Sequence, residues 1–162
     1  MTYRGNDNAR IVALVQAYLD ADYRWEQLGK WRPLRVGEPA SDIDGAFPEA
    51  SCFGLLSAWN PQSVPRLDPQ NRSADQALHL KLVDAGAICR PAFSSARDRS
   101  WREPSWLVVD MPSDHQDALA GRFGQLGTLL WSRGEVVRLR LHARQPVAAA
   151  DHPFVDWVSP TP

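Results

Sequence analysis

The segment CFGLLSAWNP, residues 52–61, contains a short apolar run that stops at an Asn-Pro pair. An apolar run of about four to eight residues between turn signals is typical of a buried β-strand. Proline has no backbone N–H group to donate, so Pro61 ends the run and begins a loop. The sequence therefore predicts a buried strand over Phe53–Trp59.

Further helices and strands are predicted after this strand. Alanines and leucines share one face of a helix over about residues 71–85, which Gly86 ends. The residues Ser113-Asp114-His115-Gln116 have the capping-box pattern that begins a second helix. Apolar or alternating runs predict strands over residues 88–94, 106–110, 128–131 and 135–142. From residue 53 the predicted order is strand, helix, strand, strand, helix, strand, strand.

The N-terminal part of the chain has weaker signals. Apolar residues at helical spacing predict an amphipathic helix over residues 8–23. A short strand is expected over Trp31–Val36, and Pro33 restricts it to the edge of a sheet. Residues 37–48 are rich in Gly, Pro, Ser and Asp, which favours a loop.

The predicted order contains the βαββαβ pattern of ferredoxin-like folds. We therefore expect an α+β fold in which an antiparallel sheet carries helices on one face. An N-terminal helix and an extra C-terminal strand are added to the ferredoxin-like core. The 162 residues are about the size of one domain. We expect a single domain over 1–162, with its core over about 9–142 and a proline-containing tail over 144–162.

Composition excludes several classes of function. The net charge of −1 lacks the positive excess that nucleic-acid binding requires. No apolar stretch approaches the length that crosses a membrane. Cys52 and Cys89 have no metal-ligand spacing and are interpreted as buried thiols, and the four histidines are scattered. We expect a cytoplasmic protein with no metal, no cofactor, and neither nucleic acid nor a membrane as its partner.

Six short motifs share their order and spacing with a known family. They are Tyr18–Tyr23, Pro33–Gly37, Ala58–Pro61, Gln70-Asn71, Trp101–Ser105 and Phe123–Gln125. Together they resemble a bacterial family called domain of unknown function 3293. The resemblance covers about residues 14–141 and implies no activity, cofactor or partner.

The predicted topology gathers polar residues at one edge of the sheet. Right-handed crossovers place the end of the first strand beside the start of its helix, the start of the third strand and the end of the second helix. Amide and carboxyl groups there suit a small polar or anionic ligand, tryptophan rings can wall a pocket, and Arg102 can neutralise an anion. The candidate ligand-binding residues are Asn60, Asn71, Trp101, Arg102, Glu103 and Gln125.

Three functional interpretations and one structural interpretation remain open from the sequence. The first is a module that binds a small polar or anionic metabolite, and the second is a protein-interaction or accessory domain. The third is a hydrolase or transferase with Glu103 as general base, although no partner acid or histidine at motif spacing supports an enzyme. In the structural interpretation Asn60 and Asn71 cap backbone groups at a turn and a helix start, Glu103 pairs with an arginine, and Gln125 ties a helix end to a strand.

Overall fold

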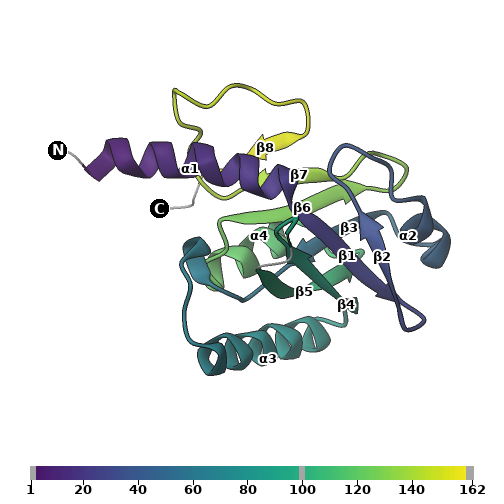
Figure 1. Ribbon diagram of the computed structural model, residues 1–162. Coiled ribbons are helices and arrows are strands. Elements are labelled where there is room, and N and C mark those ends of the chain that lie inside the picture. The colour runs from purple at the N-terminus through teal and green to yellow at the C-terminus, as the bar shows by residue number, and fades with distance from the viewer. Residues whose placement is uncertain (1–2, 99–100, 160–162) are drawn as a thin grey trace.

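A computed structural model describes residues 3–98 and 101–159, and Figure 1 shows its arrangement. Within those residues, helices and strands alternate irregularly along the chain, and the strands form one sheet. The elements in chain order are α1 (Tyr3–Asp20), β1 (Asp22–Gln27), β2 (Lys30–Leu34), α2 (Ser41–Ala46), β3 (Cys52–Leu56), the 3₁₀ turn η1 (Pro61–Ser63), α3 (Asp68–Asp84), β4 (Ile88–Ser95), β5 (Arg102–Val109), α4 (Ser113–Arg122), β6 (Gly127–Ser132), β7 (Arg138–Leu141) and β8 (Val155–Trp157).

The described strands form a mixed eight-stranded sheet in the order β2-β1-β4-β5-β3-β6-β7-β8. All neighbouring strands are antiparallel except β7 and β8, which run parallel. The α+β class is therefore confirmed, whereas a wholly antiparallel sheet is wrong. The exception arises in the tail, where residues 142–154 cross over and return the chain to the free edge of β7.

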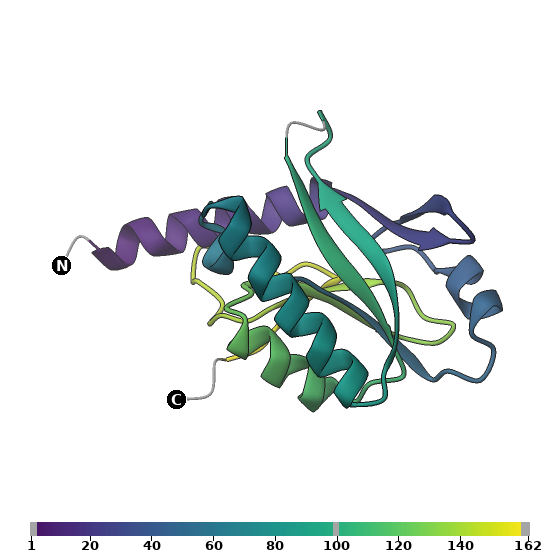
Figure 2. The same ribbon diagram turned by 90° about the horizontal axis from the view of Figure 1, so that it is seen from below.

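Alternation along β3 gives the sheet two apolar faces, because successive strand side chains point to opposite sides. Leu55 belongs to the core that α1 and α2 cover, and Leu56 belongs to the core that α3 and α4 cover. Figures 1 and 2 show α1 and α3 on opposite sides of the sheet. The expectation that helices occupy one face is therefore wrong: the apolar side of α1, with Ile11, Leu14 and Val15, buries itself on the face that α3 and α4 leave uncovered.

Several boundaries differ from the predictions. The N-terminal helix ends at Asp20 rather than residue 23, because the next residues form β1, a strand that sequence reasoning missed. The predicted loop 37–48 contains α2. The strand predicted over 106–110 is observed as β5, which begins four residues earlier, at Arg102. The strand expected near Pro33 is confirmed as β2, at one edge of the sheet.

Side chains on the α1 face fill the space between helix and sheet except near the start of β5. In the filled part of this face, Trp25, Phe53 and Leu107 are almost fully buried. Towards the C-terminal end of α1, by contrast, smaller polar side chains replace large apolar ones on β4 and β5. None of the helices in the described ranges is long and apolar enough to cross a membrane.

Candidate functional site

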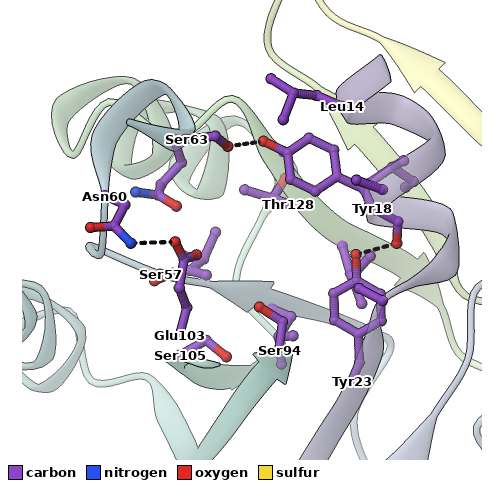
Figure 3. A pocket seen from close by; sticks show the side chains of 18 of the residues that line it. Leu14, Tyr18, Tyr23, Ser57, Asn60, Ser63, Ser94, Glu103, Ser105 and Thr128 are labelled. Carbon is purple, nitrogen blue, oxygen red and sulfur yellow. Dashed lines mark hydrogen bonds between the residues drawn. The ribbon is translucent and has the colours of Figure 1, made fainter. Parts of the chain in front are cut away.

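A cavity of about 340 Å³ lies where α1 crosses the sheet. Its walls come from α1, β1, β3, β4, β5, β6 and β7 and from the loops after β3 and α4 (Figure 3). Leucines from α1, β3, β6 and β7 supply an apolar part. The polar side chains in its lining are Tyr18, Tyr23, Ser57, Asn60, Ser63, Ser94, Glu103, Ser105, Gln125 and Thr128.

Asn60 joins the loop after β3 to α3 and β5. Its backbone N–H donates to Asn71 Oδ1 at 2.9 Å, and Asn71 Nδ2 donates back to Asn60 Oδ1 at 2.8 Å. The side-chain Nδ2 of Asn60 donates to Glu103 Oε1 at 2.9 Å. These bonds fix the Asn60 amide, so that its N–H group faces the carboxyl group of Glu103 (Figure 3).

Glu103 is the acidic group of the cavity. Only 8% of this residue is exposed, because β5 carries it on the face that α1 covers. Burial raises the pKa of its carboxyl group from 4.5 to about 7, and the hydrogen bond from Asn60 opposes this rise. No arginine among the described residues pairs with Glu103. The carboxyl group therefore changes charge near neutral pH inside a largely apolar space.

Two tyrosines close the cavity on the α1 side. The hydroxyl of Tyr18 hydrogen-bonds to that of Ser63, and the Tyr23 hydroxyl donates to the backbone oxygen of Tyr18 at 2.6 Å (Figure 3). Burial raises the pKa of both phenols above their usual range. Both tyrosines are therefore neutral at physiological pH, and they contribute hydroxyl dipoles without charge.

Ser105 has an unsatisfied hydroxyl group at the wall of the cavity. Only 6% of the residue is exposed, and its Oγ has no hydrogen-bond partner among the described residues. A buried polar group without a partner costs about 1–3 kcal/mol. A ligand with a suitable donor or acceptor would satisfy this hydroxyl.

The loop that carries Asn60 is strained. Asn60, Gln62 and Ser63 have positive φ angles of 45°, 57° and 57°. Non-glycine residues avoid this region, and such strain clusters at functional sites. Gln62 is held through its backbone N–H and its side-chain Nε2, which donate to the Gly124 oxygen at 2.7 and 3.0 Å, and Arg10 of α1 donates to its backbone oxygen.

Four of the six predicted ligand-binding residues line this cavity: Asn60, Trp101, Glu103 and Gln125. Asn71 lies behind Asn60, 1% exposed, and Arg66 Nε donates to it at 2.7 Å. Gln125 donates to the backbone oxygens of Trp59 and Phe123, as the structural interpretation expected. The same interpretation had Glu103 pairing with an arginine, whereas Asn60 is its partner.

Arg102 lies on the opposite side of the sheet from the cavity. It precedes Glu103 in β5, so alternation turns its side chain to the other face. Its guanidinium lies 3.8 Å from the centre of the Phe93 ring and 5.4 Å from that of Trp31. The role predicted for Arg102, neutralising an anionic ligand, is therefore not supported by its position.

Tyr18, Tyr23, Ser94 and Ser105 line the cavity but were not among the predicted residues. Period-two alternation beginning at Glu103 would have indicated Ser105. Tyr18 had no such signal, because its place depends on α1 crossing the face opposite α3. No group of three His, Cys, Asp or Glu in the described ranges is arranged to hold a metal ion.

Comparison with known proteins gives one family. No curated protein and no solved structure matches the chain. The model of the family described as "Protein of unknown function (DUF3293)" matches residues 56–127, from the last residue of β3 to the first of β6. This range includes Asn60, Asn71, Glu103 and Gln125. The resemblance inferred from the motifs is thus confirmed over a narrower range, and residues 56–127 are similar to the family Protein of unknown function (DUF3293).

Proposed function

We propose that the protein binds a small polar molecule with a partly apolar body in the cavity between α1 and the sheet. One observation carries this proposal: the hydrogen-bonded pair of Asn60 and Glu103 presents a buried carboxyl group to a cavity whose lining is mostly apolar in area. Small-molecule sites are typically cavities of about 300–1,000 Å³ with apolar walls and a few converging polar groups. The volume of about 340 Å³ lies at the lower end, which favours a small ligand.

Two further features support binding over a purely structural role. The strained backbone of residues 60–63 holds Asn60 and Ser63 against the cavity. Glu103 and the unpartnered hydroxyl of Ser105 are buried in the same space, although isosteric apolar side chains would avoid the desolvation of both groups. Groups that lower stability in the empty protein are expected where a ligand completes their interactions.

The lining favours a neutral or cationic polar group over an anion. Among the described residues around the cavity, none is Arg, Lys or His. An anionic ligand would therefore face the carboxyl group of Glu103 without a compensating positive charge. The anionic ligand that the sequence suggested is therefore not proposed.

A thermal-shift screen of small metabolites tests the proposal, with two tryptophan variants of α1 to locate the site. Ala17 lines the cavity and Ala13, one helical turn earlier, does not, and both are exposed. A ligand at about 100 times its Kd should raise the Tm by about 5 °C or more in the wild type and in Ala13→Trp. Ala17→Trp should abolish the shift. A screen without hits, or a shift that survives Ala17→Trp, would contradict the proposal.

We also propose that β3, α3, β4, β5, α4 and β6 form a ferredoxin-like unit. Their chain order is βαββαβ, and the sheet order β4-β5-β3-β6 with antiparallel neighbours supports this assignment. An experimental structure that superposes these elements on ferredoxin-like domains would test it.

A cytoplasmic location is proposed as well. Cys52 and Cys89 are both free thiols, which is usual in reducing compartments and supports this location. Fractionation of cells that express the chain with its own N-terminus would test it. Recovery in an oxidising compartment would contradict it.

A further inference from the structure

The carboxyl group of Glu103 has unused hydrogen-bonding capacity. An ionised carboxylate offers about four acceptor sites. Among the described residues its hydrogen-bond partner is Asn60, which binds Oε1. Glu103 is only 8% exposed and lines the cavity, so a ligand there would lie against its carboxyl group. A ligand that donates hydrogen bonds and carries positive charge would fill the free acceptor sites and compensate the charge of the carboxylate.

The hydroxyl groups near Glu103 also offer lone pairs towards a donor. The Tyr23 hydroxyl uses its hydrogen on the backbone oxygen of Tyr18, and the Ser57 hydroxyl uses its hydrogen on the backbone oxygen of Pro104, at 2.9 Å. The Tyr23 oxygen remains a hydrogen-bond acceptor, and Ser57 Oγ, which already accepts from the Trp59 backbone N–H at 3.0 Å, keeps one further lone pair. Ser105 Oγ, which is buried and unpartnered among the described residues, adds a third oxygen. Several acceptors, one carboxyl group and no basic side chain suit an ammonium group with its three donors.

We propose that the ligand is a small primary amine, whose ammonium group binds the carboxylate of Glu103 while its apolar body lies against the leucines of α1, β3, β6 and β7. This inference rests on the proposed function and specifies its ligand class. A neutral alcohol would leave the ionised carboxylate unpaired, and a carboxylate ligand would place two negative charges together. Of these three groups, the ammonium group is the one that replaces the solvation that Glu103 loses on folding.

The pH dependence of amine binding is expected to follow the ionisation of Glu103 itself. The titratable groups facing it are Tyr18 from α1 and Tyr23 from β1, both neutral over the relevant range. Arg10, further along α1, donates to the backbone oxygen of Gln62. The other polar side chains of the lining are hydroxyls and amides that do not titrate; they are Ser57, Asn60, Ser63, Ser94, Ser105, Gln125 and Thr128. Amine binding should therefore strengthen as Glu103 ionises.

Matched probes of one skeleton test the ligand class. Benzylamine, benzyl alcohol and benzoate share a ring, and hexylamine, hexanol and hexanoate share a chain. Isothermal titration calorimetry on the full chain at pH 8 should show the amine of each series binding at least tenfold more tightly than its alcohol, and no binding of the carboxylates. With the pKa of Glu103 at about 7, amine binding should be about tenfold weaker at pH 6 than at pH 8.

Two variants of neighbouring residues in β5 separate a direct role of Glu103 from a general effect of the strand. Glu103→Gln keeps an oxygen for Asn60 and removes the charge, so it should cost at least tenfold in amine affinity and remove the pH dependence while alcohol binding is unchanged. Arg102→Gln removes a charge from the opposite face and should leave amine affinity unchanged. Circular dichroism checks that both variants fold.

The outcomes distinguish the two proposals. If alcohols or carboxylates bind as tightly as the amines, or if Glu103→Gln keeps full amine affinity, the amine assignment is overturned. If the amines fail while other compounds from the metabolite screen bind in a way that Ala17→Trp blocks, the assignment is overturned and the binding function stands. If neither amines nor any screened compound binds, both proposals are overturned.

Discussion

Ser94 and Glu103 face each other across the ladder between β4 and β5. Both line the cavity, so the closest cross-strand neighbour of the buried carboxyl group is a neutral hydroxyl group. Cross-strand side chains of this kind have Cβ atoms about 4.5–5.5 Å apart, close enough for a charge at one position to act on the other. The register of these two strands therefore leaves Glu103 without an internal counter-ion.

Ser94→Lys should supply that counter-ion. The introduced ammonium group is expected to lower the pKa of Glu103 by at least about one unit, because an opposite charge at this distance favours the ionised carboxylate. Titration of the Glu103 carboxyl carbon by NMR measures the change, and the same variant should lose benzylamine binding. Ser94→Met adds a side chain of similar bulk without charge and should leave the pKa raised. A Glu103 titration near pH 7 in both variants would contradict the prediction.

Glu103→Gln should stabilise the empty protein above neutral pH. The pKa of Glu103 is raised from 4.5 to about 7, so between these values the folded state holds a proton that the unfolded state has released. The free energy of unfolding therefore falls as pH rises from about 4.5 to about 7 and levels off above it, by about 3 kcal/mol in total.

Urea unfolding of the wild type and Glu103→Gln at pH 5 and pH 8 measures this effect. The variant should lack the component of pH dependence due to Glu103 and should exceed the wild type in stability at pH 8. Equal changes between the two pH values in both proteins would show that Glu103 has no raised pKa.

Gly54→Ala should destabilise the protein through the contact between β3 and α4. A Cβ atom at Gly54 would lie 1.7 Å from Gln116 Oε1, and Gln116 is only 3% exposed, so its amide has little room to move. Its Nε2 also donates to the backbone oxygen of Met111 at 3.0 Å. We expect a loss of about 1–3 kcal/mol in the free energy of unfolding.

Two controls accompany the Gly54 variant. Gly45→Ala places a Cβ with no atom within 4 Å, so it should leave stability unchanged or raise it slightly. Adding Gln116→Ala to Gly54→Ala should recover part of the loss, because the clashing amide is removed. Full stability of Gly54→Ala alone would show that Gln116 rearranges freely.

Val155→Ala should show that the tail contributes to stability through β8. Val155 is 8% exposed, and the preceding Phe154 accepts a hydrogen bond through its backbone oxygen from Leu139 N at 2.9 Å. Truncating this buried valine is expected to cost about 2 kcal/mol, measured by denaturant unfolding. Val147 lies in the same tail and is fully exposed, so Val147→Ala should have no effect. Equal effects of the two substitutions would mean that β8 does not pack on the sheet in solution.

Local patterns in residues 52–142 were sufficient to predict most of the central elements. The apolar run at β3 and the capping pattern before α4 both correspond to real elements, because their signals act over a few residues. Asn60 and Glu103 are 43 residues apart in the chain. The handedness of crossovers was nevertheless sufficient to predict that they lie at the same edge of the sheet. Arg102 lies away from the cavity for a local reason: β5 begins earlier than expected, and alternation within it sends Arg102 to the other face.

The N-terminal contribution to the cavity required tertiary information. β1 has the sequence DYRWEQ, in which Tyr23 and Trp25 alternate with charged residues, but the alternation is short and the helix predicted over residues 8–23 overlaps it. The choice of face by α1 depends on α3 and α4 already covering the other side, which no pattern within residues 3–20 encodes. Tyr18 could therefore not be assigned to the site from the sequence.

The two ends of the cavity come from different parts of the chain. Asn60 and Glu103 lie within residues 56–127, which match the family, whereas α1 and β1 lie outside that range. A relative that shares the matched range but has another N-terminal segment would keep Asn60 and Glu103 to bind the polar group of a ligand. The part of the cavity wall that contacts the rest of the ligand would differ. Ligand preference among such relatives would then diverge by chain length and branching, while the chemistry of the anchored group stays constant.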